Sequence, residues 1–111
     1  MIVAVDYDGT LEAGGKLNLP LIARLRAAQR RGDTVILWTC REGKRLQEAL
    51  LALRGAGFRP QYVNANAPAA IRMLGHDPRK IYADLYIDDK GMATWTSQPK
   101  HGSGLSKSCE K

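Results

Sequence analysis

Short apolar runs recur along the chain, and each run ends at polar side chains. Continuous apolar runs of about four to eight residues, rich in β-branched side chains, are typical of strands buried on both faces of a parallel sheet. The runs predict strands over residues 1–5, 34–39, 62–64 and 81–87, with a fifth short strand over residues 92–96.

The segments between these runs place their apolar residues at helical spacing. The first segment starts at Asn18, a residue type that caps helix N-termini, has Pro20 in its first turn and stops at Gly32. Helices are predicted over residues 18–32, from about residue 43 to residue 55, and over residues 68–74. Gly14 and Gly15 predict a two-residue hairpin turn before the first helix. This alternation predicts an α/β fold, a three-layer α/β/α Rossmann-like domain with a central, mostly parallel sheet.

The periodic pattern stops at about residue 96. Residues 97–111 are rich in Gly, Ser and Lys and have no aliphatic periodicity, which predicts a flexible polar C-terminal tail. A chain of 111 residues has room for a single core. We therefore expect one domain over residues 1–96.

The composition excludes several classes of protein. No apolar run approaches the roughly 20 residues that span a bilayer, and acids follow the apolar start too soon for a secretory signal. A cytoplasmic protein without a membrane partner is expected, with Cys40 and Cys109 as reduced thiols. The formal net charge of +6 can attract anionic substrates or nucleic acid, although a solvated basic surface explains it equally well.

Polar side chains stand where three of the predicted strands end. Asp6 and Asp8 follow the first strand, Thr39 closes the second, and Asp88 and Asp89 follow the fourth. Open α/β sheets bind their ligands at the carboxyl edge, where such strand ends meet. Each residue alone has an ordinary explanation as a turn, cap or surface residue. Together they predict a site with several carboxylates and a hydroxyl.

The ordered set resembles the four motifs of the haloacid dehalogenase-like (HAD) hydrolase superfamily. In chain order the matches are residues 6–10 (Asp-Tyr-Asp-Gly-Thr), Thr39, Lys80 and the pair Asp88–Asp89. The first and fourth motifs are specific, whereas a lone Thr or Lys is a weak signal. Lys44 also lies near a strand end and is a rival to Lys80. The resemblance covers residues 1 to about 96.

The resemblance implies a Mg²⁺-dependent phosphomonoester hydrolase (phosphatase) that works through an aspartyl-phosphate intermediate. Asp6 would be the nucleophile, and Asp8 the general acid and base. Thr39 would donate a hydrogen bond to a phosphoryl oxygen, and Lys80 would stabilise charge. The metal ligands would be Asp6, the main-chain carbonyl of Asp8, Asp88 and Asp89.

Charge explains why such a site needs these parts. A carboxylate that attacks a phosphate dianion meets a repulsion of about 4 kcal/mol per charge pair at about 4 Å and an effective dielectric constant of about 20. Mg²⁺, which prefers oxygen ligands, offsets that repulsion. Arg41, two residues after Thr39, is a candidate substrate-binding residue because guanidinium groups bind phosphate in bidentate fashion.

The lengths between the motifs accommodate core elements alone, so the chain resembles a small capless (C0-type) member of the superfamily. The substrate, the predicted hairpin over residues 11–17 or a second copy of the chain would then have to exclude water. The expected partner is a phosphorylated small molecule, with nucleic acid and a homo-oligomer as further candidates. The alternative functions are a nucleic-acid-end phosphatase and a receiver-like phospho-aspartate signalling module, whose motif order disagrees with this sequence.

Overall fold

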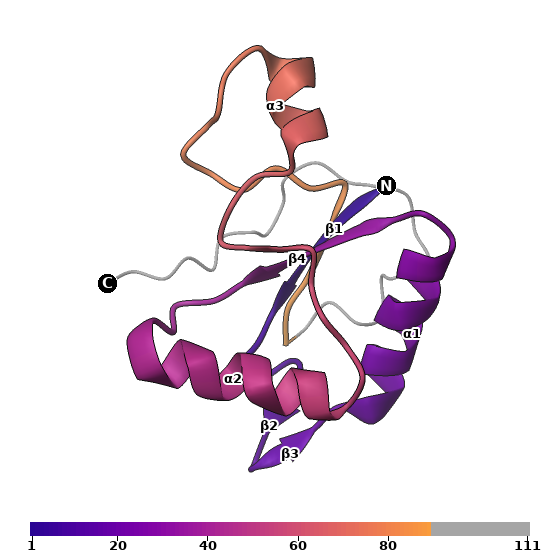
Figure 1. Ribbon diagram of the computed structural model, residues 1–111, viewed down its shortest axis with the longest axis vertical. Coiled ribbons are helices and arrows are strands. Elements are labelled where there is room, and N and C mark those ends of the chain that lie inside the picture. Colours follow the sequence, from indigo (N-terminus) through magenta and orange to yellow (C-terminus); the bar gives the residue numbers. More distant parts are fainter. Residues whose placement is uncertain (90–111) are drawn as a thin grey trace.

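The computed structural model describes residues 1–89, and the chain forms an α/β fold around a four-stranded sheet (Figure 1). The strands are β1 (Ile2–Asp6), β2 (Glu12–Ala13), β3 (Lys16–Leu17), β4 (Thr34–Trp38), β5 (Tyr62–Val63) and β6 (Leu85–Ile87). The helices are α1 (Leu19–Arg30), α2 (Gly43–Gly55) and α3 (Pro68–Leu74). None of the helices in this described part is long and apolar enough to cross a membrane.

The sheet has the order β5-β4-β1-β6, and every neighbouring pair is parallel. The first strand of the chain therefore lies inside the sheet, between two strands that come later in the sequence. Because all four strands run the same way, their carboxyl ends lie at one edge. The sheet is flanked by helices, which confirms the predicted Rossmann-like architecture.

A small antiparallel hairpin, β2–β3, leads from the first strand to α1. Gly14 and Gly15 form its turn with φ values of 62° and 80°, which glycine adopts without a steric penalty. Asn18 then caps α1, and its Oδ1 accepts a hydrogen bond from the Leu21 amide at 3.2 Å. The hairpin, the N-cap and the extent of α2 and α3 agree with the prediction, and no inserted domain interrupts residues 1–89.

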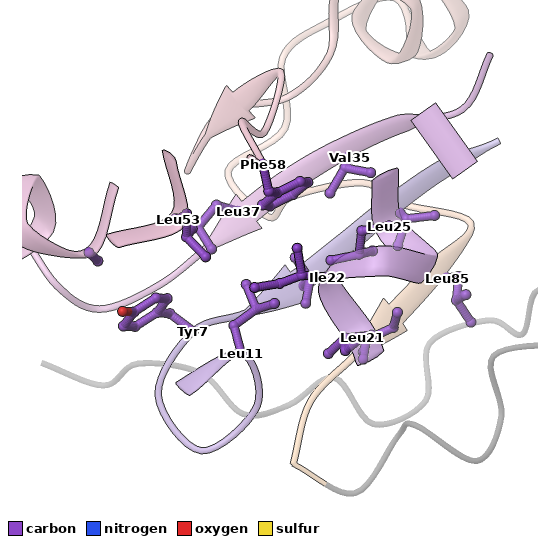
Figure 2. Packing of buried hydrophobic residues seen from close by; sticks show 14 residues of the cluster. Tyr7, Leu11, Leu21, Ile22, Leu25, Val35, Leu37, Leu53, Phe58 and Leu85 are labelled. Carbon is purple, nitrogen blue, oxygen red and sulfur yellow. The ribbon is translucent and has the colours of Figure 1, made fainter. Parts of the chain in front are cut away.

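The main core lies between α1, α2 and one face of the sheet (Figure 2). Its fully buried residues include Val3 and Val5 from β1, Leu25 from α1 and Leu53 from α2. Side chains alternate across a strand, so the even-numbered residues of β1 face the opposite side of the sheet. Asp6 therefore points away from the face that α1 and α2 cover.

The last described strand is shorter than predicted. β6 contains three residues, whereas the apolar run predicted a strand over residues 81–87. Side chains take the backbone groups that a longer strand would pair: the Tyr86 hydroxyl donates to the Ile81 carbonyl at 2.6 Å and accepts from the Ala83 amide at 3.1 Å. The Asp84 carboxylate likewise accepts the Ile2 amide at 2.7 Å.

Some predictions fall outside the described residues. These are the strand over residues 92–96, the tail over residues 97–111 and the state of Cys109. The expected state of Cys40 also stays a prediction, because the other cysteine of the chain lies outside these residues.

Candidate functional site

The two acidic segments meet at the carboxyl edge of the sheet. β1 and β6 are adjacent, and Val5 pairs with Ile87, so the residues that follow each of them leave the sheet side by side. A Cβ atom added to Gly9 would lie 3.7 Å from the Asp89 Cβ. The loop after β1 therefore packs directly against Asp89, which follows β6, although about 80 positions separate the two in the chain.

The loop after β1 is a compact turn centred on one carbonyl group. The Tyr7 carbonyl accepts the amides of Thr10, Leu11 and Glu12 at 2.9–3.1 Å. Gly9 has a φ of 81°, a conformation that non-glycine residues rarely adopt. The Asp6 Oδ1 accepts the Tyr7 amide at 2.8 Å, which orients that carboxylate at the end of β1.

Asp8 and Arg41 form a bidentate ion pair. The Arg41 Nε donates to both Asp8 carboxylate oxygens at 3.2 and 3.1 Å, and its Nη2 donates to Oδ1 at 2.8 Å. The guanidinium carbon lies 4.8 Å from the centre of the Tyr7 ring, and Nη1 donates to the Arg45 carbonyl at 3.4 Å. The Arg41 side chain is 16% exposed and the Asp8 side chain is 49% exposed. These contacts hold the guanidinium in place, next to a carboxylate that is accessible to solvent.

This ion pair shifts the pKa values of both of its members. Hydrogen bonding to the Arg41 guanidinium holds the pKa of Asp8 below its ordinary value, against the opposing effect of partial burial, and Arg45 acts in the same direction as Arg41. Asp8 in turn raises the pKa of Arg41. Burial raises the pKa of Tyr7. Asp8 is therefore an anion at neutral pH in this arrangement, whereas a general acid needs a proton to donate.

The ion pair allows the effect of an Arg41 substitution on the pKa of Asp8 to be predicted. In Arg41→Lys the ammonium cannot reproduce the bidentate contact, so we expect the pKa of Asp8 to rise toward its ordinary value. A folded-state pKa below the unfolded value of about 3.9 means that the ion pair stabilises the fold above that pH. That contribution is lost as the pH falls through the lowered pKa. Carboxyl-carbon NMR titration measures the shift.

The matched control for that titration is Arg31→Lys. Arg31 contacts Asp33 at 3.3 Å beside the start of β4, at the opposite edge of the sheet, so this variant should leave the pKa of Asp8 unchanged. An Asp8 that titrates identically in wild type and Arg41→Lys would show that the guanidinium does not determine its charge.

Thr39 lies one residue beyond β4 and is 5% exposed. Its Oγ1 accepts the Arg41 amide at 3.1 Å. Its own amide donates to the Asn64 Oδ1, and its carbonyl accepts from the Asn64 Nδ2, both at 2.9 Å. Sequence analysis missed Asn64. The signal available was an Asn at the end of a predicted strand, which by itself indicates a turn.

The candidate lysines lie on different connections. Lys44 is exposed in the first turn of α2, next to Arg45. Lys80 is exposed on the connection from β5 to β6, and its carbonyl accepts from the Asn66 Nδ2 at 3.3 Å. No described contact joins the side chain of either lysine to the acids. The role of Lys80, and its rivalry with Lys44, therefore stay predictions.

The acids at this edge can offer a metal ion only oxygen ligands. No group of three or more His, Cys, Asp or Glu side chains within residues 1–89 has the geometry of a metal cluster. Mg²⁺ often takes one or two carboxylates, with water and other oxygens completing its octahedron. The strand-end acids Asp6, Asp88 and Asp89 and the main-chain carbonyl of Asp8 fit that chemistry, and this ligand set stays a prediction.

Comparison with known proteins yields one similar structure. No protein-family model matches the chain, and a search of curated proteins gave no significant match. A solved structure of a conserved protein coded by a locus of Bacteroides thetaiotaomicron is 33% identical to this chain. The alignment covers 84% of this chain and 78% of that chain with a TM-score of 0.69, and the description of that protein states no activity.

Proposed function

The chain belongs to the same family as this conserved Bacteroides thetaiotaomicron protein, and we propose that it is a Mg²⁺-dependent phosphomonoester hydrolase. One observation carries the proposal. The Asp6–Asp8 loop packs against Asp89, which follows β6, with 3.7 Å between a Cβ built at Gly9 and the Asp89 Cβ. The order of these acids along the chain, and the hydroxyl of Thr39 between them, are those of the HAD motifs.

In the proposed reaction Asp6 is the nucleophile. One oxygen of its carboxylate attacks phosphorus, the bond from phosphorus to the ester oxygen breaks, and an aspartyl-phosphate forms. A proton from Asp8 neutralises the leaving alkoxide. Water then attacks phosphorus while Asp8 takes its proton, which releases phosphate and restores the Asp6 carboxylate. Mg²⁺ bound by Asp6, the Asp8 carbonyl and Asp88, with Asp89 nearby, would neutralise charge on the phosphoryl group.

The Asp8–Arg41 ion pair must open for this chemistry. Arg41 can donate to a phosphate dianion in the same bidentate manner as it donates to Asp8, so a bound phosphoryl group competes for the guanidinium. Loss of the guanidinium removes the largest influence that lowers the pKa of Asp8. The pKa of Asp8 would then rise toward its ordinary value, and the negative charge of the bound phosphoryl group would raise it further, which favours proton uptake by Asp8.

Within residues 1–89 the carboxyl edge of the sheet has no inserted domain over it, and this affects how water is excluded from a bound substrate. The hairpin β2–β3 is the single element between β1 and α1, so the described chain has no inserted domain over the site. The substrate, the hairpin or a second copy must then exclude water from the reacting groups. A phosphorylated small molecule is the proposed substrate in a cytoplasmic setting.

The test is phosphate release from an aryl phosphate and a panel of phosphorylated metabolites. We expect turnover in the presence of Mg²⁺, its loss on chelation, and its recovery when Mg²⁺ is returned in excess. Oligonucleotides with 3′ or 5′ phosphates belong in the panel because the net charge of +6 also suits nucleic-acid ends. Absence of turnover on every substrate would reject the proposal, and a lasting acyl phosphate without release would favour the signalling module.

A further inference from the structure

The β4–β5 pair is extended at both ends by side-chain amides. β5 contains two residues, and one amide side chain flanks it on each side. At the entry the Gln61 Oε1 accepts the Val35 amide at 2.8 Å. At the exit the Asn64 Oδ1 accepts the Thr39 amide at 2.9 Å. Both side chains replace backbone partners that a longer β5 would have supplied to β4.

The exit amide binds the main chain of one residue, whereas the entry amide binds the main chain of two, because the Gln61 Nε2 donates to the Asp33 carbonyl at 3.3 Å. Asn64 contacts the amide and the carbonyl of Thr39, both at 2.9 Å, and its own backbone amide donates to the Leu37 carbonyl at 2.8 Å. Asn64 has a φ of 52°, a left-handed conformation that no other non-glycine residue within 1–89 adopts. Asn tolerates this region better than most side chains. The backbone is therefore held in an uncommon conformation where its side chain brackets Thr39.

Hydrogen bonds lead from this bracket to the acids. The Thr39 Oγ1 accepts the Arg41 amide at 3.1 Å, and the Arg41 guanidinium holds Asp8. The first bond joins the Thr39 side chain to the Arg41 main chain, and the second joins the Arg41 side chain to the Asp8 carboxylate. A series of contacts therefore connects Asn64, through Thr39 and Arg41, to Asp8.

We infer that Asn64 is a positioning residue for the site, which holds the Thr39 hydroxyl and the Arg41 guanidinium against the loop that carries Asp6 and Asp8. Asn64 has no role in the reaction itself and acts through Thr39. This inference rests on the proposed function, since the groups that it positions are those proposed to bind phosphate. Gln61 makes the same kind of contact at the far end of β4 and positions no group of the site.

The comparison of three variants tests the inference. Asn64→Gly removes both side-chain bonds and keeps the left-handed backbone without strain. Asn64→Asp keeps the acceptor for the Thr39 amide and loses the donor to its carbonyl. Gln61→Ala is the matched control, because it removes an exposed amide that bonds the same strand at the opposite edge.

The first readout is amide hydrogen exchange, which needs no substrate. In Asn64→Gly we expect the amides of Thr39 and Arg41 to exchange roughly tenfold faster, while the Val35 amide is unchanged. In Gln61→Ala the pattern reverses. Asn64→Asp should protect Thr39 better than Asn64→Gly does. Unchanged exchange at Thr39 and Arg41 in both Asn64 variants would overturn the inference.

The second readout is kcat/KM for the phosphomonoester that the wild type hydrolyses best. Misplaced binding groups should lower kcat/KM of Asn64→Gly by roughly 10- to 100-fold, while Gln61→Ala keeps wild-type values below its unfolding temperature. Equal losses in Gln61→Ala and Asn64→Gly would show that both act through stability alone, and would overturn the inference. If wild type itself turns over no phosphomonoester, the proposed function fails, and the exchange pattern alone then decides whether Asn64 positions Thr39 and Arg41.

Discussion

Replacement of Asp6 by Asn is expected to reduce phosphomonoester turnover by roughly 10⁴-fold or more, because loss of a nucleophile removes the group on which the covalent intermediate forms. The amide is a poor nucleophile and carries no charge for Mg²⁺. Its Oδ1 can still accept the Tyr7 amide, which the carboxylate now accepts at 2.8 Å. The variant should therefore keep the loop geometry while losing the chemistry. Steady-state assays with the substrate that wild type accepts best measure the loss.

The matched control is Asp33→Asn, the same change beside the start of β4. Asp33 pairs with the N-terminal ammonium at 3.0 Å and with Arg31 at 3.3 Å, and it lies at the opposite edge of the sheet from Asp6. We expect this variant to keep turnover near the wild-type value. Trapping of phosphate on the wild-type chain but not on Asp6→Asn would support the same assignment. Appreciable turnover by well-folded Asp6→Asn would exclude Asp6 as the nucleophile.

The fold makes an independent prediction at α2, with the same substitution at a buried and an exposed position. Leu53 is fully buried in the core between the sheet and the helices (Figure 2). Leu51, two residues earlier on the same helix, is 62% exposed. Leu53→Ala should lower the free energy of unfolding by about 2–5 kcal/mol, the sum of the lost burial and the cavity left behind. Chemical denaturation monitored by circular dichroism measures the change.

Leu51→Ala provides the reference for the helix. Both residues change from Leu to Ala within α2, so differences in helix propensity largely cancel between the two variants. We expect Leu51→Ala to change the free energy of unfolding by less than about 0.5 kcal/mol. Equal stability changes in the two variants would contradict the packing of α2 against the sheet. The result does not depend on the proposed activity.

Local patterns predicted the secondary structure well, because the interactions that form these elements are close in sequence. Asn18 caps α1 through the Leu21 amide, and Gly14 and Gly15 turn the hairpin with positive φ. The prediction failed at residues 81–84, where apolar content favoured a strand. There the Tyr86 hydroxyl binds two backbone groups, and such competition from a side chain has no signature in hydrophobic periodicity.

The candidate site was predictable in its list of acids and less so in their partners. Asp6, Asp8 and the late acidic pair stand at predictable strand ends, and Gly9 packs against Asp89, while their joint role as a site stays a prediction. Arg41 was a candidate for phosphate alone, whereas in the structure it binds Asp8. Nothing local indicated that contact, since 33 residues separate the two partners.

The sequence by itself determined which segments become strands and helices, and which acids stand at the strand ends. Those outcomes depend on side-chain periodicity, capping and turn residues that act over a few positions. The tertiary structure alone decided that Asn64 brackets Thr39 and that Arg41 forms a bidentate ion pair with Asp8. Both depend on the order β5-β4-β1-β6, which places segments distant in the chain at one edge of the sheet. Hydrogen bonds and ion pairs of this kind are short-range in space and have no fixed separation in sequence.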